Sequence, residues 1–289
     1  MYELQMDIVN KSLRTWLEED IGMGDITTMT TIPKDNRSVG IIHVKDQGII
    51  AGISIAEAVF ALVDPQLKFV AKVREGQAVS KGTILAEVSG GTRSILLGER
   101  LALNLMQRMS GIATRTRQYV DALQGLPVRL VDTRKTTPGH RLLEKYAVRV
   151  GGGHNHRFGL YDAVMIKDNH IKGSGGIVQA IQAARAQIPH SMKIEVEVET
   201  MEQLELALSA QPDIIMLDNM TPAQMREAVE RMKSQAPHIV VEASGSVTLE
   251  TIHEIAQTGV DVISVGRLTY SVQALDISLD LNEQKGGQP

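Results

Sequence analysis

Basic residues are concentrated in one short stretch of an acidic chain. The segment DTRKTTPGHRLLEKYAVRVGGGHNHRFG contains Arg134, Lys135, Arg141, Lys145, Arg149 and Arg157, whereas the whole chain has a formal net charge of −4. Arginine offers a planar fork of donors that matches carboxylate or phosphate oxygens, and lysine adds a compact charge. The stretch therefore predicts a site for a polyanionic ligand. Non-specific nucleic-acid binding would instead need a basic domain.

Three of these cations have a second interpretation. Arg141, Lys145 and Arg149 recur every four residues, so they form a stripe on one face of a predicted helix. Such a stripe is equally typical of a solvated helix face. The other cations flank a predicted strand end and a glycine run. At these positions, binding of an anion is favoured over a solvated surface.

Polar residues also follow the predicted strands. Six β-branched runs begin at residues 128, 163, 194, 214, 239 and 262, and amphipathic segments lie between most of them. This alternation predicts a parallel sheet, and its regular spacing favours an open (β/α) barrel of six to seven strands over a doubly wound sheet. Active sites of such barrels lie at the carboxyl ends of the strands. Residues at these ends include Asp132, Thr133, Lys167, Asp168, Asn169, Asp218, Asn219, Ser244, Gly245, Ser246 and Gly266.

The run IEVEVE carries Glu195, Glu197 and Glu199 on one face of its strand, because successive side chains alternate. If the apolar face packs on helices, the carboxylates point into the barrel and need cationic partners. The candidate partners are Arg134, Lys135 and Lys167. The alternative is an edge strand with a solvated acidic face.

Small residues follow the last two predicted strands, in ASGSV and VGRLT. Barrels commonly bind a phosphate in these loops, on backbone amides and a helix N-terminus. Each loop alone is typical of an ordinary turn, but together they favour a phosphate site.

A histidine pair raises the alternative of a metallohydrolase. His154 and His156 form His-x-His, and His170 follows closely. Such enzymes need further ligands at later strand ends, where this chain has Asp, Ser and Gly. The chain has no cysteine, which excludes thiolate zinc sites and a cysteine nucleophile.

Glycine-punctuated strand candidates around one helical segment predict a separate N-terminal α+β domain at 1–110. The barrel is expected at 111–269, with the tail 270–289 packing on the first domain. A long helical pattern at 98–125 is expected to connect the two domains. No secretion signal or membrane-spanning run is recognisable, so a cytoplasmic location is expected.

The chain resembles quinolinate phosphoribosyltransferases over nearly its whole length. The segments that carry the resemblance are, in order, EDIGMGDITT, GERLALNLMQRMSGIAT, DTRKTTPGHRLLEKYAVRVGGGHNHR, DAVMIKDNH, EVEVE, IIMLDN and EASGSV. The resemblance implies an N-terminal α/β sandwich and an open barrel, in a homodimer or hexamer whose sites are completed by the neighbouring subunit. It also implies Mg2+-dependent phosphoribosyl transfer from phosphoribosyl pyrophosphate to quinolinate, with decarboxylation, in NAD biosynthesis.

The resemblance further implies residue roles. Quinolinate would be bound by Arg134, Arg157 and Lys167, with Arg100 from the partner chain and Thr133, Lys135 and His156 close by. Glu197 and Asp218 would hold the ribose hydroxyls and magnesium. The ribose phosphate would be bound by Ser244, Gly245, Ser246, Ser264, Val265 and Gly266. Arg141 and Lys145 would reach the pyrophosphate, either in this site or in a neighbouring one. The expected catalytic residues are Lys135, Lys167, Glu197 and Asp218.

Two positions depart from the family pattern, because Arg267 and Tyr270 stand where the family often has alanine and histidine. Two other functions stay open. A nicotinate-type transferase or another paralogue would act on a different base. A non-catalytic nucleotide-binding or molybdenum-transport-associated relative would need a broken cation set, whereas Arg134, Arg157 and Lys167 are intact.

Overall fold

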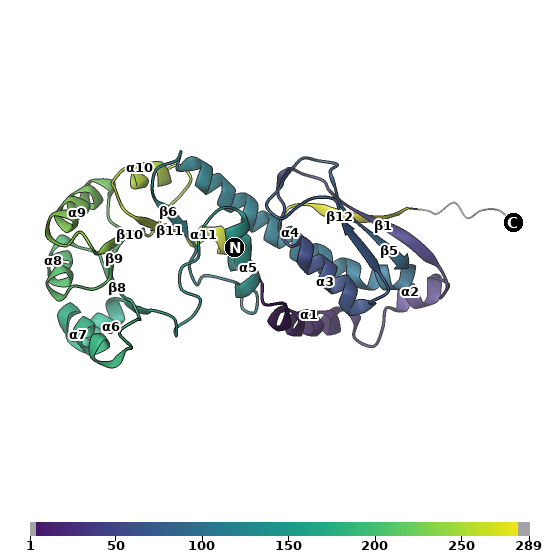
Figure 1. The fold of residues 1–289 in the computed structure, drawn as a ribbon, viewed down its shortest axis with the longest axis horizontal. Coiled ribbons are helices and arrows are strands. Elements are labelled where there is room, and N and C mark those ends of the chain that lie inside the picture. The colour runs from purple at the N-terminus through teal and green to yellow at the C-terminus, as the bar shows by residue number, and fades with distance from the viewer. Residues whose placement is uncertain (1–3, 283–289) are drawn as a thin grey trace. The chain divides into compact units, whose positions relative to one another are not determined.

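Six parallel strands, one for each run predicted from the sequence, form a single sheet (Figure 1). The computed structural model describes residues 4–282. The strand order is β6-β11-β10-β9-β8-β7. The strands are β6 (Arg129–Val131), β7 (Val164–Ile166), β8 (Ile194–Val198), β9 (Ile214–Asp218), β10 (Val240–Ser244) and β11 (Val262–Ser264). Because β6 and β7 end this sheet on either side within the described residues, the barrel is open, which confirms the predicted fold class.

Helices follow the strands and cover the outside of the sheet. They are α6 (Asp168–Ser174), α7 (Ile177–Gln187), α8 (Met201–Ala210), α9 (Pro222–Gln235), α10 (Ile252–Ala256) and α11 (Arg267–Tyr270). Local sequence sets their starts. At α9, Thr221 accepts a hydrogen bond from the Gln224 amide and Pro222 occupies the first turn, where no amide donor is needed. Val196, Leu204 and Ile215 are fully buried, so the core lies between strands and helices.

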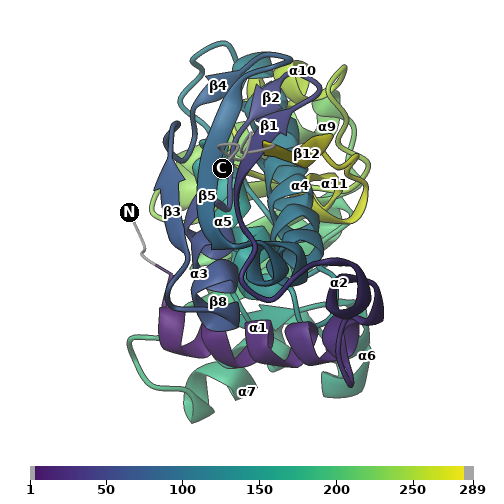
Figure 2. The ribbon, with the colours of Figure 1, turned by 90° about the vertical axis from the view of Figure 1, so that its right-hand side faces the viewer.

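The N-terminal part of the chain contains an antiparallel sheet of order β12-β1-β5-β3. The strands are β1 (Arg37–Val44), β3 (Lys68–Ala71), β5 (Ile84–Gly91) and β12 (Ile277–Asn282), and β2 (Gly48–Ile49) pairs separately with β4 (Ala78–Val79). Every second residue of β1 from Gly40 to Val44 is buried, so one face of the sheet is covered. Figure 2 shows α3 (Ile53–Val63) and α4 (Thr92–Ala122) behind this sheet. The remaining helices are α1 (Met6–Ile21), α2 (Ile26–Thr31) and α5 (Arg141–Val150).

The chain divides into two compact units that interleave along the sequence. Within the described residues, the first comprises 4–117, 137–152 and 271–282, and the second comprises 118–136 and 153–270. The segment 137–152, assigned to the barrel by the sequence-based division, thus joins the first unit. Its Gly151 lies against α4, where a Cβ atom would come within 2.5 Å of the Ala113 carbonyl oxygen.

The expected C-terminal tail supplies β12, which pairs with β1 over Val39–Val44. Residues 283–289 of that tail lie outside the described residues. Among the helices described, none is both long and apolar enough to cross a membrane.

Candidate active site

A cavity of about 460 Å³ lies in the barrel unit, lined by residues at the carboxyl ends of its strands. It brings together most of the residues predicted from the sequence. Those lining it are Thr133, Arg134, Lys135, His156, Arg157, Lys167, Glu197, Asp218, Ser244, Gly245, Ser264 and Gly266. Sequence reasoning did not single out Met165 and Met216, and it named Asn219 only as a strand end. Both methionines lie in apolar strand runs, so the sequence pattern does not distinguish them from core residues.

An ion pair joins two strand ends of the cavity. The Lys167 Nζ atom contacts the Glu197 Oε1 atom, so Glu197 has the cationic partner that the strand pattern predicted. The Lys167 side chain is 43% exposed and that of Glu197 16%. The pair is therefore accessible to a ligand from the cavity.

The other two glutamates of β8 differ from the sequence-based expectation. Glu199 lies beyond the last residue of β8 and is exposed, with its amide N–H donating to Gln203 Oε1 at 2.7 Å. It does not point into the barrel because the chain has already turned toward α8. Glu195 is buried as expected, but its partner is His156 rather than lysine or arginine.

Like charges meet at the arginines of the cavity. Burial and the nearby charge of Arg134 lower the pKa of Arg157, against the opposing effect of the acidic residues around it. The Arg157 Nη1 atom donates to the Ala163 carbonyl oxygen at 3.1 Å, which directs the guanidinium. Two cations held close together favour binding of an anion, because the anion relieves their repulsion.

The loop after β10 has an unusual backbone. Gly245 and Ser246 both have positive φ, at 90° and 52°, and a Cβ atom on Gly245 would lie 2.9 Å from the Asn219 backbone nitrogen. Glycine is therefore required there. Ser244 and Gly245 line the cavity, whereas Ser246 is exposed and does not.

Val265 is also outside the cavity lining. Its side chain is buried, and its amide N–H donates to the Val131 carbonyl oxygen at 2.9 Å. The sheet thus already uses the group that was expected to hold a phosphate. Ser264 and Gly266, on either side of it, line the cavity.

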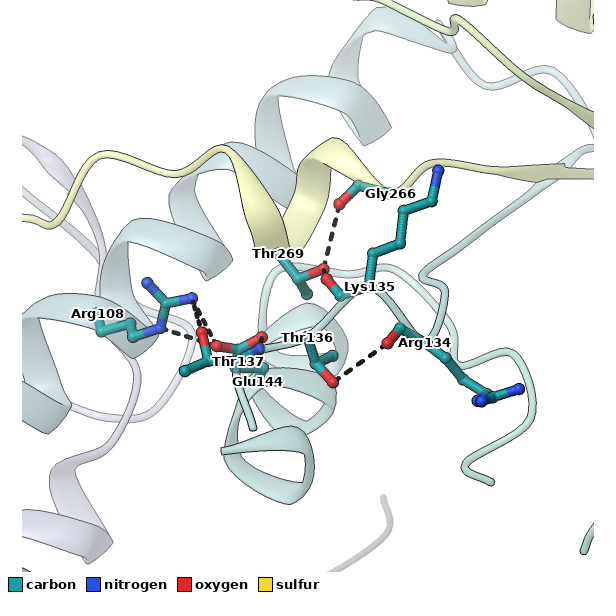
Figure 3. Close-up of polar contacts among 8 residues, drawn as sticks. All are labelled: Arg108, Arg134, Lys135, Thr136, Thr137, Glu144, Gly266 and Thr269. Atoms are coloured by element: carbon teal, nitrogen blue, oxygen red, sulfur yellow. Dashed lines mark hydrogen bonds and ion pairs between the residues drawn. The ribbon is translucent and has the colours of Figure 1, made fainter. Parts of the chain in front are cut away.

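Lys135 is held against the segment that departs from the family pattern. Thr269 Oγ1 donates to the carbonyl oxygens of Lys135 at 2.8 Å and Gly266 at 3.1 Å (Figure 3). The Lys135 Nζ atom lies 5.8 Å from the ring centroid of Tyr270, which is 54% exposed. Tyr270 thus contacts a predicted catalytic lysine, whereas Arg267 is exposed.

Three predicted residues belong to the first unit and do not line this cavity. Arg100 lines two separate hollows of that unit, one with Asp20 and Asp25 and one with Trp16. Arg141 is half-buried. Lys145 has no exposed surface, so it does not lie on a solvated helix face.

A buried cluster lies beside the cavity and was missed at the sequence level. The His156 Nε2 atom lies 3.2 Å from Glu195 Oε2 and 3.5 Å from Glu242 Oε2. Burial lowers the pKa of His156, but the two carboxylates outweigh it and raise that pKa overall. Burial also raises the pKa of Glu195. The Arg157 amide N–H donates to His156 Nδ1, which therefore carries no proton, so the protons retained by the cluster lie on Nε2 and on the carboxylates that it faces. A charged residue within the apolar run IVVEA was the one signal for Glu242.

Glu197 and Asp218 fit a hard divalent cation. They lie on the neighbouring strands β8 and β9, and both line the cavity. Carboxylate oxygens are the ligands that Mg2+ prefers, with the rest of its shell completed by water and substrate phosphates.

Comparisons with known proteins show which family the chain resembles. Residues 25–110 match the family described as quinolinate phosphoribosyl transferase, N-terminal domain, and residues 112–280 match its C-terminal domain. The probable nicotinate-nucleotide pyrophosphorylase (carboxylating) of Synechocystis is 47% identical over 95% of this chain and 92% of its own. The Bacillus subtilis protein of the same name is 46% identical over 94% and 93%.

A solved structure has the same fold. The crystal structure of NadC from Streptococcus pyogenes superposes with a TM-score of 0.93 at 39% identity, covering 98% of this chain and 99% of that one. Both domains of the family, in order and over most of the chain, are therefore present. The chain belongs to the quinolinate phosphoribosyltransferase family.

Proposed function

We propose that the protein transfers the phosphoribosyl group of phosphoribosyl pyrophosphate to quinolinate and decarboxylates it. The products are nicotinate mononucleotide, pyrophosphate and CO2, and the reaction belongs to NAD biosynthesis. Family membership supports this proposal. The observation that carries it is the cavity in which Arg134, Lys135, Arg157 and Lys167 face the acidic pair Glu197 and Asp218.

The cations suit a dicarboxylate. Arg134 and Arg157 can each offer two parallel N–H donors to a carboxylate, and Lys167 adds a point charge. Quinolinate carries two carboxylates on adjacent ring carbons, so it can engage more than one of these cations at once. Lys167 is paired with Glu197 before substrate binds, and a substrate carboxylate would share it.

The small residues of the cavity suit the sugar phosphate. Ser244, Gly245, Ser264 and Gly266 offer hydroxyls and small residues at the ends of β10 and β11. Backbone amides in such loops bind phosphate without side-chain interference. Glu197 on β8 and Asp218 on β9 lie between Lys167, which follows β7, and Ser244 on β10 in strand order, where they can accept hydrogen bonds from ribose hydroxyls.

The reaction follows from this placement. The pyridine nitrogen forms a bond to the anomeric carbon while the bond to pyrophosphate breaks, so positive charge develops on the ribose. The carboxylates of Glu197 and Asp218 stabilise that charge. Glu197 and Asp218 would hold magnesium, which would supply positive charge to neutralise the pyrophosphate leaving group.

Decarboxylation uses the pyridinium ring as an electron sink. The electron pair of the bond to the carboxylate beside the nitrogen enters the ring, CO2 leaves, and the ring carbon takes up a proton. The cation set orients the substrate for this step. We also propose a homodimer or hexamer in which Arg100 of a neighbouring subunit contributes to the quinolinate site.

Release of labelled CO2 tests the proposal. The assay compares quinolinate with and without phosphoribosyl pyrophosphate, with and without a chelator, and with nicotinate as a competing base. Release that needs both the cosubstrate and magnesium is expected. Turnover of nicotinate in place of quinolinate would overturn the assignment of the base.

A further inference from the structure

Three buried carboxylates surround one short loop of the barrel unit. Asp132, Glu195 and Glu242 are 0%, 1% and 2% exposed, and none of them lines the cavity. Asp132 follows β6, Glu195 lies on β8 and Glu242 lies on β10. The Oε1 atoms of both glutamates are buried without a hydrogen-bond partner among the described residues. Burying a carboxylate oxygen without a hydrogen-bond partner lowers the stability of the fold. A functional role is therefore the stronger explanation for these residues.

Asp132 fixes the backbone of the loop. Its Oδ1 atom accepts the His156 amide N–H at 2.9 Å, and its Oδ2 atom accepts the Asn155 side-chain amide at 2.6 Å. These bonds hold the two residues that precede Arg157.

The glutamates fix the side chain of the same loop. His156 Nε2 points at Glu195 Oε2 and Glu242 Oε2, while His156 Nδ1 accepts the Arg157 amide N–H at 2.8 Å. Since Nδ1 acts as an acceptor, the ring proton lies on Nε2, toward the carboxylates. The imidazole is therefore held between the carboxylates and the backbone of Arg157.

The same atoms could be taken for a metal site, since one ligand atom from each of the three side chains lies within 4.8 Å of the others. A metal-binding Nε2 atom must lack a proton, and its Nδ1 atom normally donates a hydrogen bond. In this loop Nδ1 accepts one instead. The geometry favours a hydrogen-bonded scaffold over a metal centre.

We propose that Glu195 and Glu242 are positioning residues that act through His156 to set the place of Arg157 for binding a substrate carboxylate. The inference rests on the proposed function, in which Arg157 binds quinolinate. Without the glutamates the imidazole loses its anchor, and the Arg157 backbone loses a fixed acceptor. Misplacement of a binding group by about 1 Å can cost on the order of 100-fold in rate.

The test compares Glu242→Leu and Glu195→Leu with Glu242→Gln and Glu195→Gln. Leucine removes the acceptor for Nε2–H, whereas glutamine keeps an acceptor oxygen at similar size. We expect the leucine variants to raise the KM for quinolinate about tenfold or more. The KM for phosphoribosyl pyrophosphate should change less than about threefold, and the glutamine variants should recover most of the loss.

Several outcomes would overturn the proposal. They are an unchanged KM for quinolinate, equal losses for both substrates, or no recovery by glutamine. If the leucine variants do not fold, quinolinate binding to His156→Ala is measured by calorimetry, with the glutamine double variant as the matched control, and wild-type affinity in His156→Ala overturns the proposal. A stoichiometric metal in the purified parent protein, lost in Glu195→Gln, would replace the scaffold with a metal centre. Failure of the proposed function is distinguishable, because the parent enzyme would then release no CO2 from quinolinate.

Discussion

The ends and the middle of the cation-rich segment 132–159 belong to different units of the molecule. The ends lie in the barrel unit, where Arg134, Lys135 and Arg157 line the cavity. The middle, 137–152, belongs to the first unit and lines no part of that cavity. In the sequence the two parts form one continuous basic stretch. The density of charge along the chain therefore does not by itself define a binding site. Strand ends direct side chains into a common space, whereas a helix distributes them around its axis.

Charged residues of the middle pack inside their own unit. Arg108 Nη2 lies 2.6 Å from Glu144 Oε1, and Glu144 is 1% exposed (Figure 3). Glu144 Oε2 also accepts the Thr137 amide N–H at 3.3 Å. Lys145, next to it, is fully buried. We therefore expect changes in the middle to affect stability and changes at the ends to affect catalysis.

The largest expected effect is on stability. Glu144→Ala leaves Arg108 without its buried partner and should lower the free energy of unfolding by about 3–5 kcal/mol. Urea unfolding followed by circular dichroism measures the loss. Glu144→Gln is the matched control, because it keeps an acceptor and should lose less. A wild-type urea midpoint for Glu144→Ala would show that the pair is not structural.

Arg157→Ala should have the largest effect on catalysis. Removing a charge that binds a carboxylate costs about 2–3 kcal/mol, so kcat/KM for quinolinate should fall roughly 30- to 150-fold. Steady-state kinetics with quinolinate varied measures it. Arg149→Ala, a half-buried cation of the middle, is the control and should stay within about threefold of the parent. Equal losses in both variants would remove the distinction between ends and middle.

Glu197→Gln tests the role of the carboxylates that line the cavity. The amide keeps the shape but loses the charge that stabilises the developing positive ribose, so kcat should fall about tenfold or more. The KM for either substrate should change less. A rise in KM with kcat unchanged would assign Glu197 to substrate binding alone.

Tyr270→Ala should have the smallest effect. Its contact with Lys135 is an exposed cation–π interaction worth about 0.5–1 kcal/mol, so kcat/KM should fall about two- to fivefold. Tyr270→Phe keeps the ring and should match the parent. A large loss in Tyr270→Phe would show that the hydroxyl contacts substrate, as a replacement for the family histidine.

The same contrast explains what sequence reasoning could reach. All six barrel strands were predicted, because apolar runs and strand-end polarity are local signals. The glutamate cluster at His156 was missed because its members come from a loop, β8 and β10 and meet only in the folded barrel. Glu199 was misplaced because alternation alone does not say where a strand ends. The burial of Lys145 was not predicted because helical spacing does not show what packs against each face.

The pairing of β1 with β12 has a consequence for synthesis on the ribosome. Residues Val39–Val44 find their neighbours at Ile277–Asn282, so one edge of the N-terminal sheet stays open while the whole barrel is being made. An open edge with alternating apolar residues can pair with other chains. Completion of the N-terminal sheet therefore waits until β12, which follows every barrel strand in the sequence, has emerged, and during that interval the nascent chain depends on rapid barrel folding or on chaperones.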